Sequence, residues 1–492
     1  MPDTASPKRV IVVGGGITGL TVCYRLQRAA QEQGLALDVR LLEASGRLGG
    51  LIGTAYEQDC VLEQGPDCFL AAKPWGMRLC EDLGLTSEMI GTTAQHRQSF
   101  IVRDGRLLPV PQGFYLMVPG SCWSLLTTPV FSWPGKLRMA LDLVLPRRQE
   151  PGDESLAAFV TRRLGREALE RMAQPMIGGI YTADPQYLSM QATMPQFLEM
   201  EQQHGSLIRA MLTRQRAASQ PPQGTSGPRY GLFVSFRRGM QTLIDALADR
   251  LPAESVQLNT PVSSLRYCQD TRRWLVQRGA QPTLEAEALC LCLPAPRASQ
   301  LLAALDAPLA TALQTIPYAS SAILNIICRR SAIAHPLHGM GFVVPAVEQA
   351  ALIACSFSSV KFAGRAPQEH VLLRAFVGGA LQAAQLDGSD ADIQQRVYAQ
   401  LQRFLGITGP PQALHLVRHT QSMPQYHIGH LERIGAIEAR VQQFPGLMLA
   451  GNAYRGVGIP DAIHSADTAA RALLGYLVSP GADAMTRRTK ST

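Results

Sequence analysis

Several features that would place this chain in other structural classes are missing from its sequence. No apolar run reaches the roughly 18 uninterrupted residues that a membrane-spanning helix needs. The cysteines form no Cys-x-x-Cys pair, and the nearest pattern, Cys290-Leu291-Cys292, has no second Cys or His pair nearby to complete a metal site. The stretch from Met1 to Lys8 is polar and unlike a signal peptide. We therefore expect reduced core cysteines, no metal and a cytoplasmic location.

Charge is also sparse, at 17% of residues, although its balance is basic at +8. The basic residues are scattered, apart from arginine pairs such as Arg147-Arg148, Arg162-Arg163 and Arg237-Arg238 and a C-terminal cluster, Arg487-Arg488-Thr489-Lys490. No predicted helix carries a basic stripe with interleaved aromatic residues, so nucleic acid is not expected as a partner. A length of 492 residues suggests more than one domain, and no internal repeat is present.

The chain begins with the pattern of a β-α-β unit. Val10 to Val13 form a short apolar run typical of a buried parallel strand, and a glycine-rich turn follows directly. A helix is predicted from Ile17 to about Gly34, and a second strand from Leu37 to Leu42.

The spacing of the glycines in this turn fits a dinucleotide-binding loop. Gly14 would permit the sharp bend, Gly16 the approach of a pyrophosphate, and Gly19 the close packing of helix on strand. Glu43 ends the second strand, 24 residues after Gly19. Its carboxylate would accept hydrogen bonds from ribose hydroxyls and repel a 2′-phosphate, which favours FAD or NAD over NADP.

Two further segments favour FAD over NAD. The sequence after Glu43 contains a second glycine pair and an arginine, in Ala44, Arg47, Gly49 and Gly50. Near the other end, an apolar strand leads into a glycine-rich turn and a helix, with candidate cofactor-binding residues Gly451, Asn452, Gly458, Ile459 and Pro460. Because these segments are roughly 400 residues apart, the two ends of the chain should fold into one domain with another domain inserted between them.

The middle of the chain is less regular. Large apolar and aromatic residues concentrate between Leu107 and Pro134, which indicates either a buried segment broken by prolines or an amphipathic loop that enters a membrane interface. Helical patterns dominate from Leu156 to Leu212. Strands are predicted at 255–258, 274–277 and 288–293, and short strands between Ser321 and Val377.

Taken together, the chain resembles the protoporphyrinogen oxidase and coproporphyrinogen III oxidase family of the flavin amine oxidase superfamily, from about Lys8 to Leu477. The motifs that carry this resemblance are Glu63-Gln64-Gly65-Pro66-Asp67-Cys68-Phe69, Gly105-Arg106-Leu107-Leu108-Pro109, Glu154-Ser155-Leu156 and Pro175-Met176-Ile177-Gly178-Gly179-Ile180-Tyr181. The resemblance adds Gly65, Pro66 and Asp67 to the expected FAD-binding residues.

The resemblance implies an α/β fold with a Rossmann-like FAD/NAD(P)-binding domain of the p-hydroxybenzoate hydroxylase type, an inserted α+β substrate domain and a helical domain that can contact membrane. The expected boundaries are residues 8–92, 229–294 and 437–477 for the FAD-binding domain, 93–112 and 295–436 for the substrate-binding domain, and 113–228 for the helical domain with a loop at 217–228. Residues 478–492 would form a tail.

In this family the substrate is a porphyrinogen, so the resemblance implies substrate-binding roles for four residues. Gly179 would offer its backbone carbonyl to pyrrole N–H groups, and Leu324 and Phe357 would enclose the macrocycle. Many eukaryotic relatives have a propionate-binding arginine where this chain has Ser99. Arg97 would replace it if the following strand extends that far, and a solvated surface cation is an equally good interpretation.

The activity implied is the six-electron oxidation of coproporphyrinogen III or protoporphyrinogen IX in heme biosynthesis, with molecular oxygen as acceptor and hydrogen peroxide as product. Ser99 favours the bacterial coproporphyrinogen type slightly. Flavin carries the chemistry, so no catalytic side chain is predicted. A peripheral membrane contact, a homodimer and handover of the product to a ferrochelatase are compatible with the resemblance. The alternatives are a flavin amine oxidase or carotenoid desaturase, and a flavin-binding protein without catalysis.

Overall fold

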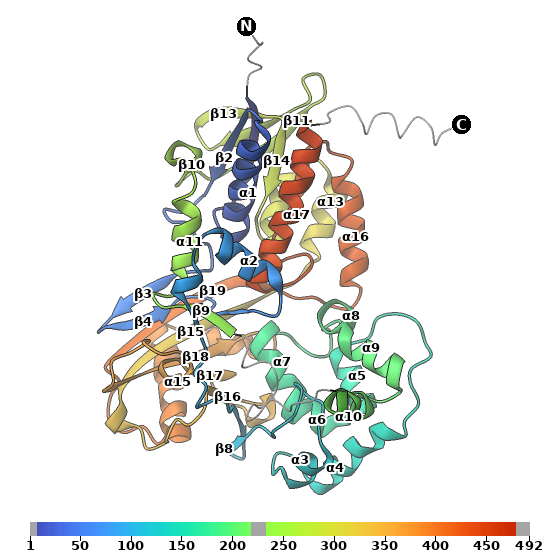
Figure 1. The fold of residues 1–492 in the computed structure, drawn as a ribbon, viewed down its shortest axis with the longest axis vertical. Helices are drawn as coiled ribbons and strands as arrows, with labels where there is room; N and C mark the ends of the chain where they lie inside the picture. Colours follow the sequence, from blue (N-terminus) through green and yellow to red (C-terminus); the bar gives the residue numbers. More distant parts are fainter. Residues whose placement is uncertain (1–6, 218–232, 479–492) are drawn as a thin grey trace.

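The computed structural model describes residues 7–217 and 233–478, which form three regions (Figure 1). A domain built on a parallel sheet lies at one end, and a domain built on a seven-stranded sheet and a helical domain lie side by side at the other. The predicted loop at 217–228 and the tail at 478–492 lie outside the described residues, except for Ala217 and Val478.

The parallel sheet joins both ends of the chain, as the sequence predicts. Its strands, in spatial order, are β10 (Val256–Gln257), β2 (Leu37–Leu42), β1 (Lys8–Val13), β14 (Ala288–Leu291) and β20 (Leu447–Leu449). All pairings within it are parallel.

Alternate residues of β1 enter two different cores, which is why its apolar run is continuous. Val10 and Val12 pack among helices α1 (Ile17–Gln33), α2 (Pro74–Asp82), α11 (Gln241–Ala248) and α17 (Ile459–Val478). Ile11 and Val13 face the second core. That core contains the small sheet β11 (Ser264–Cys268), β12 (Arg273–Arg278) and β13 (Gln281–Ala286), and helices α12 (Ala295–Leu302), α13 (Ala307–Gln314) and α16 (His430–Val441).

This second core corrects the expected domain boundaries. Helices α12 and α13 and the start of α16 fall in the range 295–436, which the sequence analysis assigned to the substrate-binding domain. Their apolar residues, among them Leu302, Leu313 and Ile434, nevertheless pack against the parallel sheet. The second stretch of the inserted domain, which follows the stretch at 93–112, therefore begins with the strand after α13.

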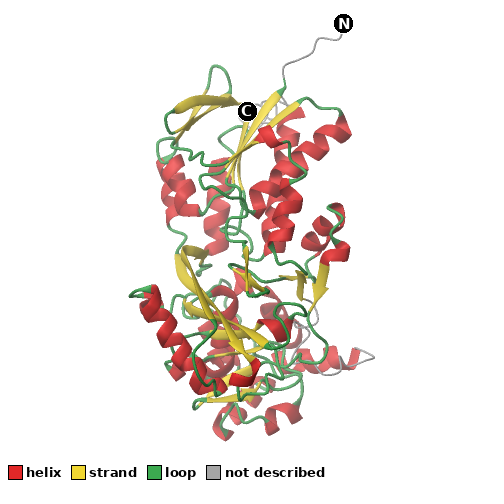
Figure 2. Ribbon diagram, turned by 90° about the vertical axis from the view of Figure 1, so that its left-hand side faces the viewer, coloured by secondary structure: helices red, strands yellow, loops and turns green. Residues whose placement is uncertain are grey.

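The seven-stranded sheet is mixed, since one of its pairs is parallel and the others are antiparallel. Its strands, in spatial order, are β19 (Ala413–Pro424), β15 (Tyr318–Arg329), β18 (His370–Gly378), β17 (Ala354–Phe357), β16 (Gly341–Val343), β7 (Phe100–Arg103) and β8 (Arg106–Pro109). Helix α15 (Asp390–Leu405), which begins with a capping box at Ser389 and Asp392, packs on one face of the sheet. Figure 2 shows the sheet strands between the helices of this half of the molecule.

Two small sheets connect these domains. Strands β3 (Thr54–Glu57) and β4 (Cys60–Glu63) form a hairpin, and β9 (Phe233–Phe236) pairs with both β5 (Phe69–Leu70) and β6 (Met89–Gly91).

The helical domain surrounds its own apolar core. Its helices are α3 (Cys122–Thr127), α4 (Trp133–Ala140), α5 (Leu156–Arg163), α6 (Arg166–Ala168), α7 (Gln174–Tyr181), α8 (Met190–Thr193), α9 (Pro195–His204) and α10 (Leu207–Ala217), with a π-helical turn at Leu169–Ala173 between α6 and α7.

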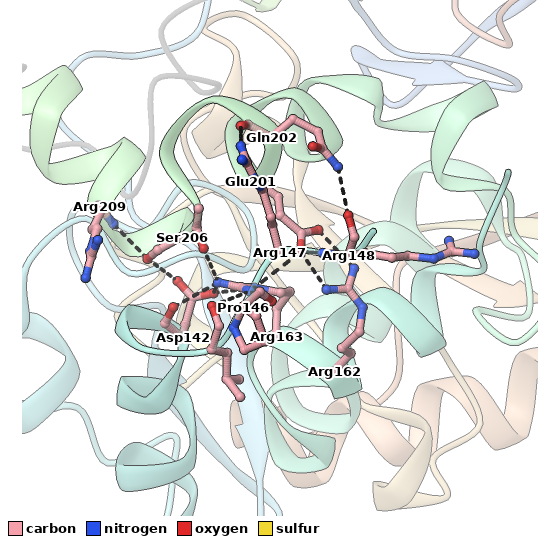
Figure 3. Close-up of polar contacts among 12 residues, drawn as sticks. Asp142, Pro146, Arg147, Arg148, Arg162, Arg163, Glu201, Gln202, Ser206 and Arg209 are labelled. Atoms are coloured by element: carbon pink, nitrogen blue, oxygen red, sulfur yellow. Dashed lines mark hydrogen bonds and ion pairs between the residues drawn. The ribbon is translucent and has the colours of Figure 1, made fainter. Parts of the chain in front are cut away.

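A buried ionic group at Asp142, Arg163 and Glu201 joins α5 to the segment after α4 and to α9 (Figure 3). All three side chains are buried. The Arg163 guanidinium donates to the Asp142 carboxylate and to four backbone carbonyls, those of Asp142, Leu145, Pro146 and Gly205. All five N–H donors of Arg163 therefore have partners, as burial of a charge requires.

Candidate functional site

The glycine-rich turn has the geometry that its spacing predicts. Gly14 has φ +107°, and a Cβ there would lie 2.5 Å from the Cys292 carbonyl oxygen. A Cβ at Gly19 would lie 1.9 Å from the Gly14 carbonyl oxygen, so helix and strand can pack this closely only without a side chain. A Cβ at Gly16 would meet only the Gly50 Cα, at 3.9 Å. Gly16 is therefore not required by packing within the protein, and the space beside it is open to a ligand.

Glu43 lies next to this turn at the carboxyl end of β2. One carboxylate oxygen accepts a hydrogen bond from the Gly15 N–H at 2.6 Å and the other from the Ser45 N–H at 2.8 Å. Each oxygen keeps a second lone pair. A cavity of about 70 Å³ opens here, lined in part by Gly14, Glu43, Ala44 and Thr260. Ligands bind outside the carboxyl ends of strands in open α/β sheets, and this cavity occupies that position.

The second glycine pair is held against the first turn. The Gly49 N–H donates to the Gly15 carbonyl at 2.8 Å, and a Cβ at Gly50 would lie 3.3 Å from the Gly16 Cα. The Arg47 guanidinium donates to the carbonyls of Gly50 and Ile52. In this conformation Arg47 thus orders the loop that carries the glycines.

The Gly65-Pro66-Asp67 segment is held by the seven-stranded sheet. Three consecutive carbonyls accept hydrogen bonds from side chains on three neighbouring strands: Glu63 from Asn325 (3.0 Å), Gln64 from His419 (2.8 Å) and Gly65 from Arg374. A Cβ at Gly65 would lie 1.7 Å from the Leu51 carbonyl oxygen, so this segment also packs directly on the second glycine loop.

Asp67 continues this contact as a carboxylate whose side chain is 13% exposed. Its Oδ2 lies 2.8 Å from the Lys361 Nζ, and its Oδ1 lies 3.6 Å from Arg374 Nη1. Burial favours the neutral acid, but Lys361 and Arg374 outweigh it and hold the pKa of Asp67 well below its usual range. Burial raises the pKa of the neighbouring Cys68 thiol to about 12, so this thiol is neutral. Asp67 therefore stays ionised at the junction of the two domains.

The remaining candidate cofactor residues lie near the other end of the chain, between Gly451 and Pro460. Gly451 has φ +139°, no atom would lie within 4 Å of its Cβ, and its N–H donates to the Ser465 hydroxyl at 3.0 Å. Gly458 donates its N–H to Asp461 in the first turn of α17, which begins at Ile459 and Pro460. Lys73 pairs with the same Asp461 at 2.5 Å. The Asn452 carbonyl accepts a hydrogen bond from the Tyr426 hydroxyl at 2.6 Å.

The residues proposed for substrate binding are placed less favourably. Leu324 and Phe357 are fully buried on the sheet face that packs against α15, in one core with Ile393 and Leu401. Their neighbour Asn325 points to the opposite face, toward Glu63. In this conformation neither Leu324 nor Phe357 offers surface to a ligand.

Gly179 and Arg97 complete that set. Gly179 is exposed in the last turn of α7, where helix carbonyls lack partners within the helix. No atom would lie within 4 Å of a Cβ at Gly179, so the space around it is open. Strand β7 begins at Phe100, and Arg97 lies in the loop before it instead of on the strand face. Arg97 was expected to replace the arginine missing at position 99 only if the strand extended back to it, and the strand does not.

Four residues that hold the Gly65–Asp67 segment were not predicted from the sequence: Asn325, Arg374, His419 and Lys361. One signal was available, because Asn325 interrupts the apolar run Ala322-Ile323-Leu324-Asn325-Ile326-Ile327 of a predicted strand. A lone amide in such a run needs a buried partner. In the described parts of the chain, no group of three or more His, Cys, Asp or Glu side chains could hold a metal ion.

Comparison with known proteins matches this geometry to one family. The profile of flavin-containing amine oxidoreductases covers residues 17–474. This chain belongs to that family. The resemblance found in the sequence is confirmed by relatives that align over nearly the full length.

Two bacterial relatives bear the name coproporphyrinogen III oxidase. The protein of Bacillus subtilis is 33% identical over 96% of this chain and 99% of its own length. That of Propionibacterium freudenreichii is 36% identical over 100% of this chain and 96% of its own. The protoporphyrinogen oxidase of Bos taurus is 32% identical over 95% and 98%.

Among solved structures, one from Exiguobacterium sp. 255-15, provisionally named a protoporphyrinogen oxidase, has a TM-score of 0.84 at 31% identity and covers 95% of this chain and 99% of that one. A UDP-galactopyranose mutase has a TM-score of 0.72 at 13% identity, with 95% and 96% coverage, and shares the fold. The predicted fold class, an α/β flavoprotein with a Rossmann-like domain, is thus confirmed.

The residues present fit a flavin cofactor. The open side of Gly16 and the cavity beside Glu43 border the joined glycine loops, and Gly451, with an open side of its own, follows β20 of the same parallel sheet. The chain is therefore a flavin-containing oxidoreductase. Among residues 7–217 and 233–478, no helix combines the length and apolar character needed to cross a bilayer.

Proposed function

We propose that this protein binds FAD and oxidises a porphyrinogen to the porphyrin in heme biosynthesis, with molecular oxygen as acceptor and hydrogen peroxide as product. The observation that supports this most directly is full-length similarity to bacterial coproporphyrinogen III oxidases, together with a flavin site whose loops come from both ends of the chain. FAD, when bound, supplies the acceptor for the hydride that leaves the substrate.

The chain's own contribution is binding and orientation. Gly14, Gly16 and Gly19 admit the diphosphate, Glu43 would receive the ribose hydroxyls, and the Gly65–Asp67 and Gly451–Pro460 segments would border the ring system. For the substrate, the exposed carbonyl end of α7 at Gly179 offers acceptors suited to pyrrole N–H groups. No side chain is assigned a proton transfer.

The decisive experiment supplies anaerobically prepared coproporphyrinogen III and protoporphyrinogen IX to the purified, flavin-loaded protein in air and follows porphyrin fluorescence. Enzyme-dependent fluorescence is expected, and the ratio of kcat/KM values identifies the preferred substrate. If the protein binds FAD but oxidises neither compound, assays with amines and carotenoid precursors test the alternative activities. If its reduced flavin also stays reduced in air, the protein is a flavin-binding protein without oxidase activity.

A peripheral membrane contact is a second proposal, carried by a separate observation. The aromatic stretch from Phe114 to Trp133 divides in the structure: Phe114, Val130 and Phe131 are buried, whereas Trp123 and Trp133 are 74% and 64% exposed. Exposed Leu137, Leu141 and Val144 continue from Trp133 at intervals of four, four and three residues, which places them on one helical stripe.

This apolar surface, consisting of Trp123, Leu126, Trp133, Leu137, Leu141 and Val144, lies on α3, α4 and the turn that follows, at the end of the helical domain farthest from the parallel sheet (Figure 1). Tryptophan pairs of this kind favour the interfacial region of a bilayer. Trp123→Ser with Trp133→Ser should weaken binding to anionic vesicles about tenfold or more. The control is Leu381→Ser, an exposed position in the domain of the seven-stranded sheet, which should not weaken vesicle binding. Absence of vesicle binding by the wild type would refute the membrane contact.

A cytoplasmic location is supported by the ten cysteines, which are all free. A homodimer and handover to a ferrochelatase rest on the family resemblance alone.

A further inference from the structure

Tyr426 lies beneath the loop that joins β20 to α17. It follows β19 of the seven-stranded sheet by two residues and is 1% exposed. Its hydroxyl donates to the Asn452 carbonyl at 2.6 Å and accepts from the Gly456 N–H at 2.7 Å. One buried hydroxyl therefore joins two points of the loop.

His430, the first residue of α16, reinforces this contact. Its ring stacks on Tyr426 with a centroid separation of 3.9 Å and an interplanar angle of 14°. Its Nε2 lies 2.8 Å from the Tyr454 carbonyl oxygen, and the side chain is fully buried. Asn452, Tyr454 and Gly456, three alternate residues of the loop, are thus held by two stacked side chains from outside it.

We propose that Tyr426 and His430 are positioning residues for the flavin, which fix the loop from Ala450 to Gly458 before the cofactor binds. This inference rests on the proposed FAD site. The loop contains Gly451, Gly456 and Gly458, and glycine-rich backbone loses much entropy when it is ordered. A loop that is already ordered lets more of the interaction energy appear as affinity.

The other contacts of the loop support this assignment. At its start the Ala450 N–H donates to the Leu291 carbonyl of β14, and the Gly451 N–H donates to Ser465 of α17. These bonds fix the ends that adjoin regular structure. The backbone of the middle of the loop, at Asn452 to Gly456, receives its bonds from Tyr426 and His430, and the Arg455 side chain adds an exposed ion pair with Glu438 of α16. Loss of the two buried side chains would therefore release the backbone that lacks support from the sheet.

The test compares Tyr426→Phe with Tyr398→Phe. Both substitutions remove a phenolic hydroxyl that hydrogen-bonds to the backbone, but Tyr398 lies in helix α15, outside the proposed FAD site, and its hydroxyl donates to the Gly409 carbonyl at 3.0 Å. FAD is titrated into each apoprotein, and its dissociation constant is read from the quenching of flavin fluorescence. We expect Kd to rise about tenfold in Tyr426→Phe, as the loss of two hydrogen bonds allows, and to change less than about twofold in the control.

Two further measurements separate positioning from general stability. The visible absorption band of bound FAD should shift in Tyr426→Phe, because its ring environment changes, whereas the melting temperature of the apoprotein should match that of the control. His430→Gln, which can still donate to Tyr454, should retain FAD better than His430→Leu. Equal Kd and spectra in Tyr426→Phe and the wild type would overturn the proposal.

Failure of the positioning role can be distinguished from failure of the proposed function. A wild type that binds FAD without oxidising any porphyrinogen would refute the substrate assignment and leave this comparison intact. A wild type that does not bind FAD would refute both.

Discussion

The protein buries charge in two places, and the two are built differently. In the helical domain, Arg163 bonds with all five of its N–H donors (Figure 3). At the junction of the two sheet domains, a second group contains two carboxylates and three cations, Glu63, Asp67, Lys361, Arg365 and Arg374. We call the group of Asp142, Arg163 and Glu201 the helical-domain cluster and the group of five residues the junction cluster.

The junction cluster is not saturated by the protein. Arg365 Nη1, Arg374 Nε and Asn325 Oδ1 are buried and have no hydrogen-bond partner among the described residues. The cluster also has one more cation than carboxylate. In the helical domain Arg163 itself has no such atom, and the Nε of Arg162, which pairs with Glu201, is the one unpartnered atom beside it among the described residues. Spare bonding capacity beside the Gly65–Asp67 segment is typical of a region built to function. The variants below test this difference.

The largest effect is expected from Arg163→Met. It leaves the Asp142 carboxylate buried without its cation and removes donors from four carbonyls, so the free energy of unfolding should fall by about 3–5 kcal/mol. Urea denaturation measures this. Arg166→Ala is the matched control. Arg166 is an exposed residue of α6 that pairs with Glu170 four residues later, and its loss should leave the urea midpoint unchanged, because solvent screens exposed ion pairs. A mild effect of Arg163→Met would remove the distinction between the clusters.

Lys361→Met should have a smaller effect, about 2–3 kcal/mol at pH 7, because Arg374 still faces Asp67. The depressed pKa of Asp67 contributes stability that is present above its unfolded pKa of about 3.9 and is lost as pH falls through the folded value. The difference between wild type and Lys361→Met should therefore shrink below about pH 4. Lys361→Arg should retain most of the stability. A difference that did not depend on pH would contradict an ionic role.

Asn325→Leu tests the junction without changing its charge. The substitution conserves volume but leaves the buried Glu63 carbonyl without its donor, so we expect a loss of about 1–2 kcal/mol in thermal or urea unfolding. It should also weaken FAD binding, because the Gly65–Asp67 segment follows that carbonyl. Unchanged FAD affinity would show that the spare capacity at the junction has no part in the cofactor site.

The smallest effect is expected at His419. Burial lowers the pKa of His419, so the unfolded chain binds a proton more readily and this residue reduces stability as pH falls below about 6.5. His419→Gln can still donate to Gln64 and cannot become charged. Its stability should therefore fall less than that of the wild type between pH 7 and pH 5, by an amount up to about 1 kcal/mol. Parallel pH profiles would contradict this interpretation.

The sequence was most informative where structure depends on local pattern. The helix predicted from Ile17 ends at Gln33, and Gly34 caps it with φ +64°. The strand predicted at Leu37–Leu42 has those bounds, and the glycines of the first turn have the predicted steric roles. Each of these features follows from neighbours in sequence, through periodicity, turn conformation and close backbone contact.

The sequence was least informative where partners are distant along the chain. Asn325, Arg374 and His419 contact residues that precede them by 262, 309 and 355 positions. Side chains alternate between the two faces of a strand, and the sequence does not show which face meets a ligand. Leu324 and Phe357 were therefore predicted to bind substrate, although their side chains enter the core beside α15. The helices α12 and α13 show the same limitation, because only the folded chain reveals which sheet they cover.

The order of strands in the parallel sheet affects how the protein folds during its synthesis on the ribosome. Strands β1 and β2 are synthesised first, but their sheet is complete only after β20, at Leu447–Leu449, has emerged. At ~5–20 residues per second, this interval is roughly 20–80 seconds. Until then the nascent glycine turn lacks the loop that follows β20. Nascent chains arrested before Leu447 should therefore fail to retain flavin, whereas released full-length chains should retain it.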